Sequence, residues 1–456
     1  MKDLRQFLDM LKKNGELLSI TDEVDPRFEI SEFLRQVDKA GGPALLFEKV
    51  KGNSARIAGN LVGTRRRLAL AFGAQSDLEL LEMYQKRRAR RMTPRTVRSG
   101  PVKEVVIKGE KKVDLNALPI PTYHEGDGGP YVTCGILAAK DPVSGLRSMG
   151  LHRLHIKGPR RVGVHLSNPP ISRFAAEAEE KKKPLDVAIS LGVHPIILLA
   201  SIVSSPTEDK VAIASSLMGS PISLVKGETV NAEAPADAEV VIEGRILPNV
   251  REKEGPFGET SGYYFSDESH VIEVTAITHR ESPIIQALHP TVHEVSLLGG
   301  PAGEAEMTRM LKERGFAVTA LAITPSSNRT HVAISIQKKH ESEPRQLLHF
   351  ILSGVPYIKH AVVVDDDVNV NDAEDIEWAV ATRFQGDLDL VVIPDMRARS
   401  IDPSKKQGNF MTKVGLDATV PLPLRERFKR ITVPLEVTEK VAGIVSRLWG
   451  KGVKSQ

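Results

Sequence analysis

The middle of the chain carries the run YVTCGILA at residues 131–138, an apolar stretch with glycine and proline close by on either side. Similar short runs follow at residues 162–166 and 240–242, and glycines and prolines punctuate the whole region from Pro119 to about Gly300. Short apolar runs separated by turn residues indicate strands. This middle section is therefore predicted to be mainly β.

The sequences on either side of this section mix helical and extended patterns. The first part, to about Leu115, combines amphipathic helical spacing with short β-rich runs such as residues 44–47 and 105–107. After Ala302, helix-type and strand-type segments alternate, as is typical of α/β domains. The sequence predicts three domains, at residues 1–115, 116–305 and 306–456.

The composition is that of a globular protein with no special affinity for polyanions. The 456 residues are 41% hydrophobic and 26% charged, and 62 basic residues against 58 acidic ones leave a formal net charge of +4. The one dense basic run, residues 86–95, lacks interleaved aromatic residues and is interpreted as a surface helix. Nucleic-acid binding is not indicated.

Three features point to a cytoplasmic protein. The single cysteine, Cys134, excludes intramolecular disulfides and zinc sites built on several thiolates, which fits a reducing compartment. Residues 1–11 have the spacing of an amphipathic helix and not of a signal peptide. The longest apolar stretch, residues 189–203, contains His194 and Pro195 and is shorter than the roughly 18 residues of a membrane span. It is predicted to be buried.

Two carboxylates, Glu254 and Glu259, flank a segment that cannot be helical. Pro256 fixes its own φ, and Gly255 and Gly258 permit a sharp turn that could aim both carboxylates at one point. Two close carboxylates push their pKa values apart, so one can remain protonated as an acid at neutral pH. The alternative is a surface turn with solvated acids.

Arg153 lies in an apolar, alternating run, where an unpaired guanidinium would be costly. It needs an anion, which is either a substrate carboxylate held through two hydrogen bonds or a structural carboxylate. Three nearby histidines, His152, His155 and His165, do not have the spacing of a zinc site and are interpreted as structural.

Other metal and nucleotide patterns are weak. His289 and His293 are four residues apart, but Pro290 argues against the helix that would place them on one face. The acidic run at residues 365–367 lacks the glycine and glutamate of a calcium loop and is interpreted as a strand-end turn. No Walker loop, dinucleotide fingerprint, nucleophile elbow or zincin motif is present.

In their order along the chain, these residues resemble the UbiD family of decarboxylases that use prenylated FMN. Several motifs in the right order are far more specific than one, and here they cover nearly the whole chain. The matching segments are residues 126–129 with Thr133, 148–153, His165, 254–262 with Tyr263, 297–300, 365–370, 381–383 and 413–419.

The resemblance implies a fold of the α/β plus β type. Its central domain is similar to the split β-barrel of flavin reductases and binds prenylated FMN, and α/β domains flank it at the N- and C-terminal ends. The C-terminal domain is expected to serve oligomerisation, in a homodimer or higher homo-oligomer. The implied partners are a small carboxylic acid and a prenyltransferase that supplies the cofactor.

The implied reaction is the reversible, non-oxidative decarboxylation of an α,β-unsaturated, aromatic or heteroaromatic acid. The reaction leaves electron density on carbon, and prenylated flavin provides the electron sink that no side chain does. By the resemblance, Arg153 orients the carboxylate, Glu254 holds Arg153, and Glu259 delivers the proton. The cofactor is expected to be lined by Thr133, Ser148, Met149, Gly150, Leu151, His152, Arg153, Val164 and His165, and the substrate by Leu298.

The sequence departs from the family at the metal site. The family typically binds manganese, often with potassium nearby, through an asparagine, a histidine and a glutamate beside the cofactor phosphate. Here His165 matches, but Ser148 stands at the asparagine and Lys210 at the glutamate, and a charged lysine cannot ligate a metal. Lys210 is expected to replace the metal; the alternative places Lys210 in solvent and Glu208 on manganese with His165.

Two rival functions remain. The same chemistry could run as carboxylation in the working direction, which the sequence does not distinguish. A non-catalytic flavin-binding or assembly subunit would be expected to lose catalytic residues, and the presence of Arg153, Glu254 and Glu259 together argues against it.

Overall fold

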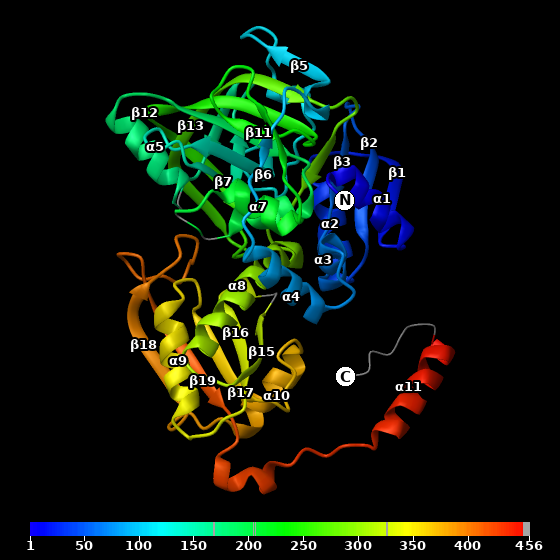
Figure 1. Cartoon of the computed structure of the whole chain (residues 1–456), viewed down its shortest axis with the longest axis vertical. Coiled ribbons are helices and arrows are strands. Elements are labelled where there is room, and N and C mark those ends of the chain that lie inside the picture. The colour runs from blue at the N-terminus through cyan, green and yellow to red at the C-terminus, as the bar shows by residue number, and fades with distance from the viewer. Residues whose placement is uncertain (167–168, 204, 206, 325–326, 450–456) are drawn as a thin grey trace.

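A computed structural model describes residues 1–166, 169–203, 205, 207–324 and 327–449. Within these residues the strands form four sheets. Figure 1 shows an N-terminal α/β unit beside a β-rich middle unit, and a C-terminal α/β unit below them, with the long helix α8 (His293–Glu313) running between.

The N-terminal sheet takes its last strand from far downstream in the chain. Its order is β1 (Leu17–Val24), β2 (Ala44–Val50), β3 (Arg56–Gly59) and β14 (Ile284–Ala287), with β14 parallel to β3. Helix α1 (Leu4–Lys13) buries the apolar positions that its spacing predicted. The other helices of this unit are α2 (Glu29–Lys39), α3 (Arg65–Phe72) and α4 (Asp77–Arg88).

The middle unit is a closed antiparallel barrel, which confirms the predicted fold class. Its strands are, in order, β12 (Val240–Gly258), β9 (Leu185–Leu191), β6 (Tyr131–Lys140), β7 (Arg147–Ile156), β8 (Arg161–Val164) and β13 (Tyr264–His279). The pairing of β12 with β13 closes the ring. Strand β5 (Val105–Lys108) extends the sheet from β13, and a small sheet joins β11 (Glu233–Pro235), β10 (Ser223–Lys226) and β4 (Arg95–Thr96).

The barrel wall separates two hydrophobic cores. Alternate residues of β6 face opposite sides: Leu137 and Ala139 pack inside the barrel, whereas Ile136 and Ala138 pack outside it. The outer core includes α6 (Pro195–Ile202) and α7 (Lys210–Met218), and α5 (Ile171–Glu180) packs with the inner core. Because both faces of β6 are covered, the run that indicated a strand is apolar at nearly every position.

The C-terminal unit is a five-stranded sheet with helices. Its strand order is β15 (Val318–Ile323), β16 (His331–Ile336), β17 (His360–Asp365), β19 (Phe410–Ala418) and β18 (Leu390–Arg397), and its helices are α9 (Glu343–Gly354) and α10 (Ala373–Arg383). Asp365 ends β17, and Arg383 pairs with Asp365 at 3.0 Å and with Asp367 at 2.6 Å. The acidic run is therefore a strand-end turn, as the sequence predicted.

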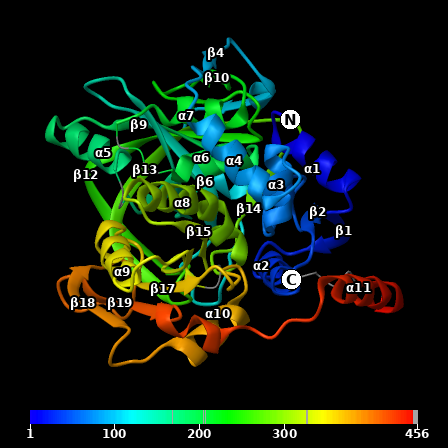
Figure 2. The same cartoon turned by 60° about the horizontal axis from the view of Figure 1, so that its bottom comes forward.

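The last helix, α11 (Leu435–Trp449), lies apart from the three units in both Figure 1 and Figure 2, at the end of an extended stretch of chain. Short 3-10 turns occur at Pro101–Lys103, Leu115–Ala117 and Leu422–Phe428. Helix α4 ends at Arg88, so only the start of the basic run at residues 86–95 is the predicted surface helix. The described residues include no helix long and apolar enough to cross a bilayer.

The predicted domain boundaries at residues 115 and 305 stay a prediction. Strand pairing crosses the first, because β5 joins the barrel, and α8 spans the second. The apolar stretch at residues 189–203 is buried, as predicted, in the end of β9 and in α6.

Candidate active site

Strand β7 carries Arg153, and two carboxylates converge on its guanidinium. Nε of Arg153 donates to Oε1 of Glu254 at 3.0 Å, and its Nη2 donates to Oε2 at 2.6 Å, which is a bidentate pair. Its remaining nitrogen, Nη1, contacts Oε1 of Glu259. The three side chains are nearly inaccessible, with exposed fractions of 10%, 0% and 11%.

The local geometry of β12 explains how both acids reach one arginine. The ladder with β13 shifts register between Glu254 and Phe257, and Gly255 in this bulge has a φ of 104°. A Cβ at Gly255 would lie 2.6 Å from the Phe265 carbonyl oxygen, so the position requires glycine. The alternative interpretation, a surface turn with solvated acids, is wrong because Glu254 and Glu259 are both buried.

Aromatic rings enclose this ion cluster. The guanidinium carbon of Arg153 lies 5.5 Å from the ring centre of Phe257 and 5.0 Å from that of Phe265. Tyr131 packs 4.3 Å from Phe257 and stacks on His155 at 4.6 Å. These apolar faces exclude water and strengthen the charge interactions. The sequence predicts no role for Phe257 or Phe265, although Phe257 stands between the two candidate acids.

Asp127 fixes the backbone next to Glu259. Its Oδ1 accepts from the Gly258 amide at 2.8 Å, and its Oδ2 accepts from the amides of Tyr123 and His124 at 3.2 and 2.9 Å. The loop after Tyr123 therefore holds the segment that carries the second acid. From the sequence alone, Asp127 is part of a matching motif and has no predicted role.

The residues expected to line the cofactor divide between two faces of β7. Strand pleating places residues 148, 150 and 152 on one face and residues 149, 151 and 153 on the other. Met149 packs into the outer core. On the opposite face, a Cβ at Gly150 would lie 2.7 Å from Nε2 of His152. A single cavity therefore cannot receive every side chain of residues 148–153.

Three other predicted residues are tightly packed. Oγ1 of Thr133 lies 2.7 Å from the Tyr123 hydroxyl and accepts from the Leu288 amide at 3.1 Å. Val164 is fully buried in the inner core, and Leu298 on α8 is buried in the outer core. Val164 and Leu298 can offer only apolar surface to a ligand, and the hydroxyl of Thr133 already has two hydrogen-bond partners.

Two predicted polar groups have no hydrogen-bond partner among the described residues. These are the Ser148 hydroxyl and Nε2 of His165, both buried. Nδ1 of His165 lies 3.5 Å from Asp267, and the His165 carbonyl oxygen lies 3.3 Å from Nδ1 of His152. Burial lowers the pKa of His165, and it lowers the pKa of His152 to about 4, so both rings are neutral at pH 7.

Three family models match the chain in sequence order. The N-terminal, Rift-related and C-terminal domains of 3-octaprenyl-4-hydroxybenzoate carboxy-lyase match residues 8–87, 95–293 and 296–418. The chain belongs to the UbiD family of carboxy-lyases.

UbiD relatives resemble this chain over almost their whole length. The anhydromevalonate phosphate decarboxylase of Methanothermobacter thermautotrophicus is 33% identical over 439 residues, covering 94% of this chain and 99% of that protein. The UbiD-class enzyme HmfF from Pelotomaculum thermopropionicum, in complex with FMN, is 41% identical with a TM-score of 0.90, over 95% and 98% of the two chains. An evolved dimeric form of HmfF with prenylated FMN is 40% identical with a TM-score of 0.86, over 95% and 97%.

The structure of this UbiD chain contradicts the alternative prediction for the metal site, which placed Lys210 in solvent and Glu208 on the metal. Lys210 does not point to solvent: it is 6% exposed, and its Nζ donates to the Ser201 carbonyl oxygen at 2.8 Å. Glu208 does not turn inward, because its Oε2 pairs with Arg88 at 2.5 Å and accepts from Ser205 at 2.5 Å. In the described part of the chain, no three His, Cys, Asp or Glu residues cluster as metal ligands.

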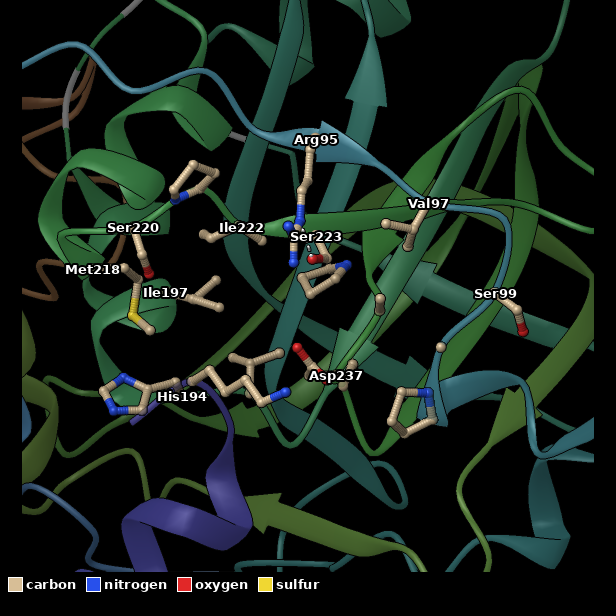
Figure 3. Close-up of a pocket in the computed structure, with 18 residues that line it drawn as sticks. Arg95, Val97, Ser99, His194, Ile197, Met218, Ser220, Ile222, Ser223 and Asp237 are labelled. Atoms are coloured by element: carbon tan, nitrogen blue, oxygen red, sulfur yellow. Dashed lines mark hydrogen bonds between the residues drawn. The ribbon is translucent and has the colours of Figure 1, made fainter.

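A cavity of about 370 Å³ lies elsewhere in this UbiD chain (Figure 3). Arg95 and Ser223, which are paired on the adjacent strands β4 and β10, both line it and share a 3.0 Å hydrogen bond. His194 lines it too, but its Nδ1 accepts from the Ile196 amide at the start of α6, which is a capping role. None of the predicted site residues lines this cavity.

Proposed function

We propose that this chain catalyses the reversible, non-oxidative decarboxylation of an α,β-unsaturated, aromatic or heteroaromatic acid with prenylated FMN. The observation that carries the proposal is the buried contact of Arg153 with both Glu254 and Glu259. Two further observations support it. Solved relatives with 40% and 41% identity hold prenylated FMN and FMN, and within the described residues the Ser148 hydroxyl and Nε2 of His165 are buried polar groups without a hydrogen-bond partner.

Arg153 would receive the substrate carboxylate on the edge that Glu259 now contacts. Glu254 is fully buried and holds Arg153 through two hydrogen bonds, so its release would leave an uncompensated charge. Glu259 touches one nitrogen only and lies just beyond the end of β12. The substrate therefore displaces Glu259 and keeps Glu254 as the support of the guanidinium.

Displacement prepares Glu259 to act as the acid. Without its cationic partner, and beside a bound carboxylate, the Glu259 carboxyl group favours its protonated form. When the bond to carbon dioxide breaks, the electron pair stays on the substrate carbon, and prenylated FMN, when bound, supplies the electron sink. Glu259 then gives its proton to that carbon and regains one from solvent. The same groups serve carboxylation in reverse.

The proposed assembly is a homodimer or a multiple of it. Helix α11 exposes an apolar side that includes Leu435, Val441 and Leu448, with exposed fractions of 72%, 48% and 82%. It lies apart from the three folded units (Figures 1 and 2). Exposed apolar surface of this kind marks a contact with another chain. Truncation before Lys429 should lower the number of chains per particle, measured by analytical ultracentrifugation. An unchanged number of chains would exclude α11 from the interface.

Co-expression with a flavin prenyltransferase provides the test of the reaction. Mass spectrometry of the released cofactor should detect prenylated FMN only in the co-expressed protein. Carbon dioxide release should then appear with at least one member of a panel of cinnamic, hydroxybenzoic, heteroaromatic and unsaturated phosphorylated acids. Activity with unmodified FMN alone would contradict the proposal, as would complete inactivity of the prenylated form on the whole panel.

A further inference from the structure

Lys210 is a buried cation without a counter-charge. It is the first residue of α7, and in the described residues no carboxylate lies within ion-pair distance of its Nζ. Its one hydrogen bond, to the Ser201 carbonyl oxygen, uses one of the three donors of an ammonium group. Burial lowers the pKa of Lys210 to about 8, which leaves the group protonated at neutral pH. A bound anion beside Lys210 would offset the cost of burying this charge.

The surroundings of Lys210 connect it to the unpartnered groups on the barrel. Arg147 on β7 pairs with Asp209 at 2.6 Å, which ties the residue before Ser148 to the residue before Lys210. The charge of Lys210 also contributes to lowering the pKa of His152, whose ring contacts the His165 carbonyl. His152 therefore links the charge of Lys210 to the segment that carries His165. The Ser148 hydroxyl and Nε2 of His165 have no hydrogen-bond partner among the described residues.

This donor set suits an anion and does not suit a divalent metal. Of the three groups, only the His165 imidazole is a good metal ligand, and the nearest acid, Asp267, is half exposed. Glu208 is held by Arg88. The first amides of α7 are taken by Asp209, which accepts from Val211 at 2.9 Å and Ala212 at 3.2 Å, so the helix end is not the anion site either. Of these three groups, Lys210 is therefore the one that can offer a positive charge to an anion.

We propose that Lys210 binds the phosphate of the flavin directly, in place of a divalent metal, and that the flavin site of this chain is therefore independent of metal. This inference rests on the proposed flavin-dependent function, because it takes the flavin phosphate as the anion. Ser148 and His165 would complete the site as neutral hydrogen-bonding groups. Lys210 would then discriminate between flavins that carry a phosphate and those that do not.

The full-length chain, produced without a prenyltransferase, allows the test by fluorescence titration with FMN and with riboflavin, which lacks the phosphate. FMN affinity should be the same in excess EDTA and in MnCl2, and metal analysis should find less than one divalent ion per chain. Lys210→Gln, which keeps a donor for Ser201 but removes the charge, should weaken FMN binding on the order of 10- to 100-fold. Riboflavin affinity should not change, and Lys210→Arg should restore FMN binding.

Lys413 is the matched control. It is also buried, with a pKa lowered to about 8, and its Nζ donates to the carbonyls of Leu352 and Val355 at 2.7 and 2.8 Å. Lys413→Gln should leave the preference for FMN over riboflavin intact. If Lys210→Gln instead weakened FMN and riboflavin equally, Lys210 would only cap α6, as Lys413 caps α9, and the inference would be wrong.

A second variant tests the metal directly. Lys210→Glu should bind FMN weakly in EDTA and regain affinity when MnCl2 is added, because a carboxylate beside His165 can ligate the ion. Wild-type binding that collapses in EDTA and returns with MnCl2 would overturn the inference. The binding results are separate from the test of the reaction. Inactivity on every acid would refute the proposed reaction. A wild-type chain that binds FMN no more tightly than riboflavin would refute the role of Lys210.

Discussion

Two buried cations lie along the same barrel wall, and they are compensated in opposite ways. Arg153 on β7 is in contact with two carboxylates of its own chain, Glu254 and Glu259. Lys210, the first residue of the helix α7 that packs against β7, has only a carbonyl oxygen as its partner in the described part of the chain. The first region therefore carries a complete set of charges, and the second carries an excess of positive charge.

The difference separates the tasks of the two regions. A guanidinium that already has two acids can exchange one of them for a substrate carboxylate with little change in local charge, which suits repeated binding and release. An uncompensated ammonium gains most from an anion that stays bound, such as a cofactor phosphate. Turnover should therefore depend on the Arg153 region and cofactor retention on the Lys210 region.

The strongest test of this division is Glu259→Gln. Glutamine has a similar shape but no transferable proton at neutral pH, so turnover should fall by about 10²- to 10⁴-fold while prenylated FMN is retained. Carbon dioxide release and cofactor absorbance measured on the same sample give both quantities. Glu252→Gln is the control, because Glu252 lies on β12, two residues before Glu254, and binds Lys157 and Arg161 away from the cluster. Near-normal turnover in Glu259→Gln would remove Glu259 as the acid.

A smaller effect is expected for Arg153→Lys. An ammonium cannot hold both oxygens of Glu254 and also bind a carboxylate through a planar fork, so kcat/KM should fall roughly 10- to 100-fold. Flavin content should not change. Arg161→Lys, on the exposed side of β8, should be silent in both measurements. The assignment would be wrong if Arg153→Lys lost flavin while the flavin-bound fraction kept its normal kcat/KM. Arg153 would then serve cofactor retention and not turnover.

The Arg153 region could be predicted in outline because its constraints are local. An arginine in an apolar strand needs an anion, and a Gly-Pro segment between two glutamates cannot be helical. What could not be predicted is how the acids arrive there, because the register shift in β12 depends on its pairing with β13. The aromatic faces of Phe257 and Phe265 depend on the same pairing.

The Lys210 region and part of the fold were harder to predict, since they depend on distant pairings. Lysine is rarely buried, and the burial of Lys210 depends on the carbonyl of Ser201 on the neighbouring helix. In the same way, β14 joins the N-terminal sheet beside β3, more than 200 residues earlier in the chain. Hydrophobic periodicity predicts strands but not which strands pair.

The last test is the pH dependence of FMN binding, which depends on the charge of Lys210 and not on that of Arg153. The pKa of Lys210 in the flavin-free chain is lowered to about 8, whereas a bound phosphate favours the protonated form. FMN affinity should therefore be level from about pH 6.5, where the phosphate is mostly dianionic, to about pH 8, and then decline by up to about tenfold per pH unit. His152 and His165 do not contribute in this range, because burial lowers their pKa values and they are already neutral. Riboflavin should show a level profile, and so should FMN with Lys210→Arg, whose guanidinium stays protonated. A wild-type profile for FMN that stays level to pH 10 would show that the charge of Lys210 does not hold the phosphate.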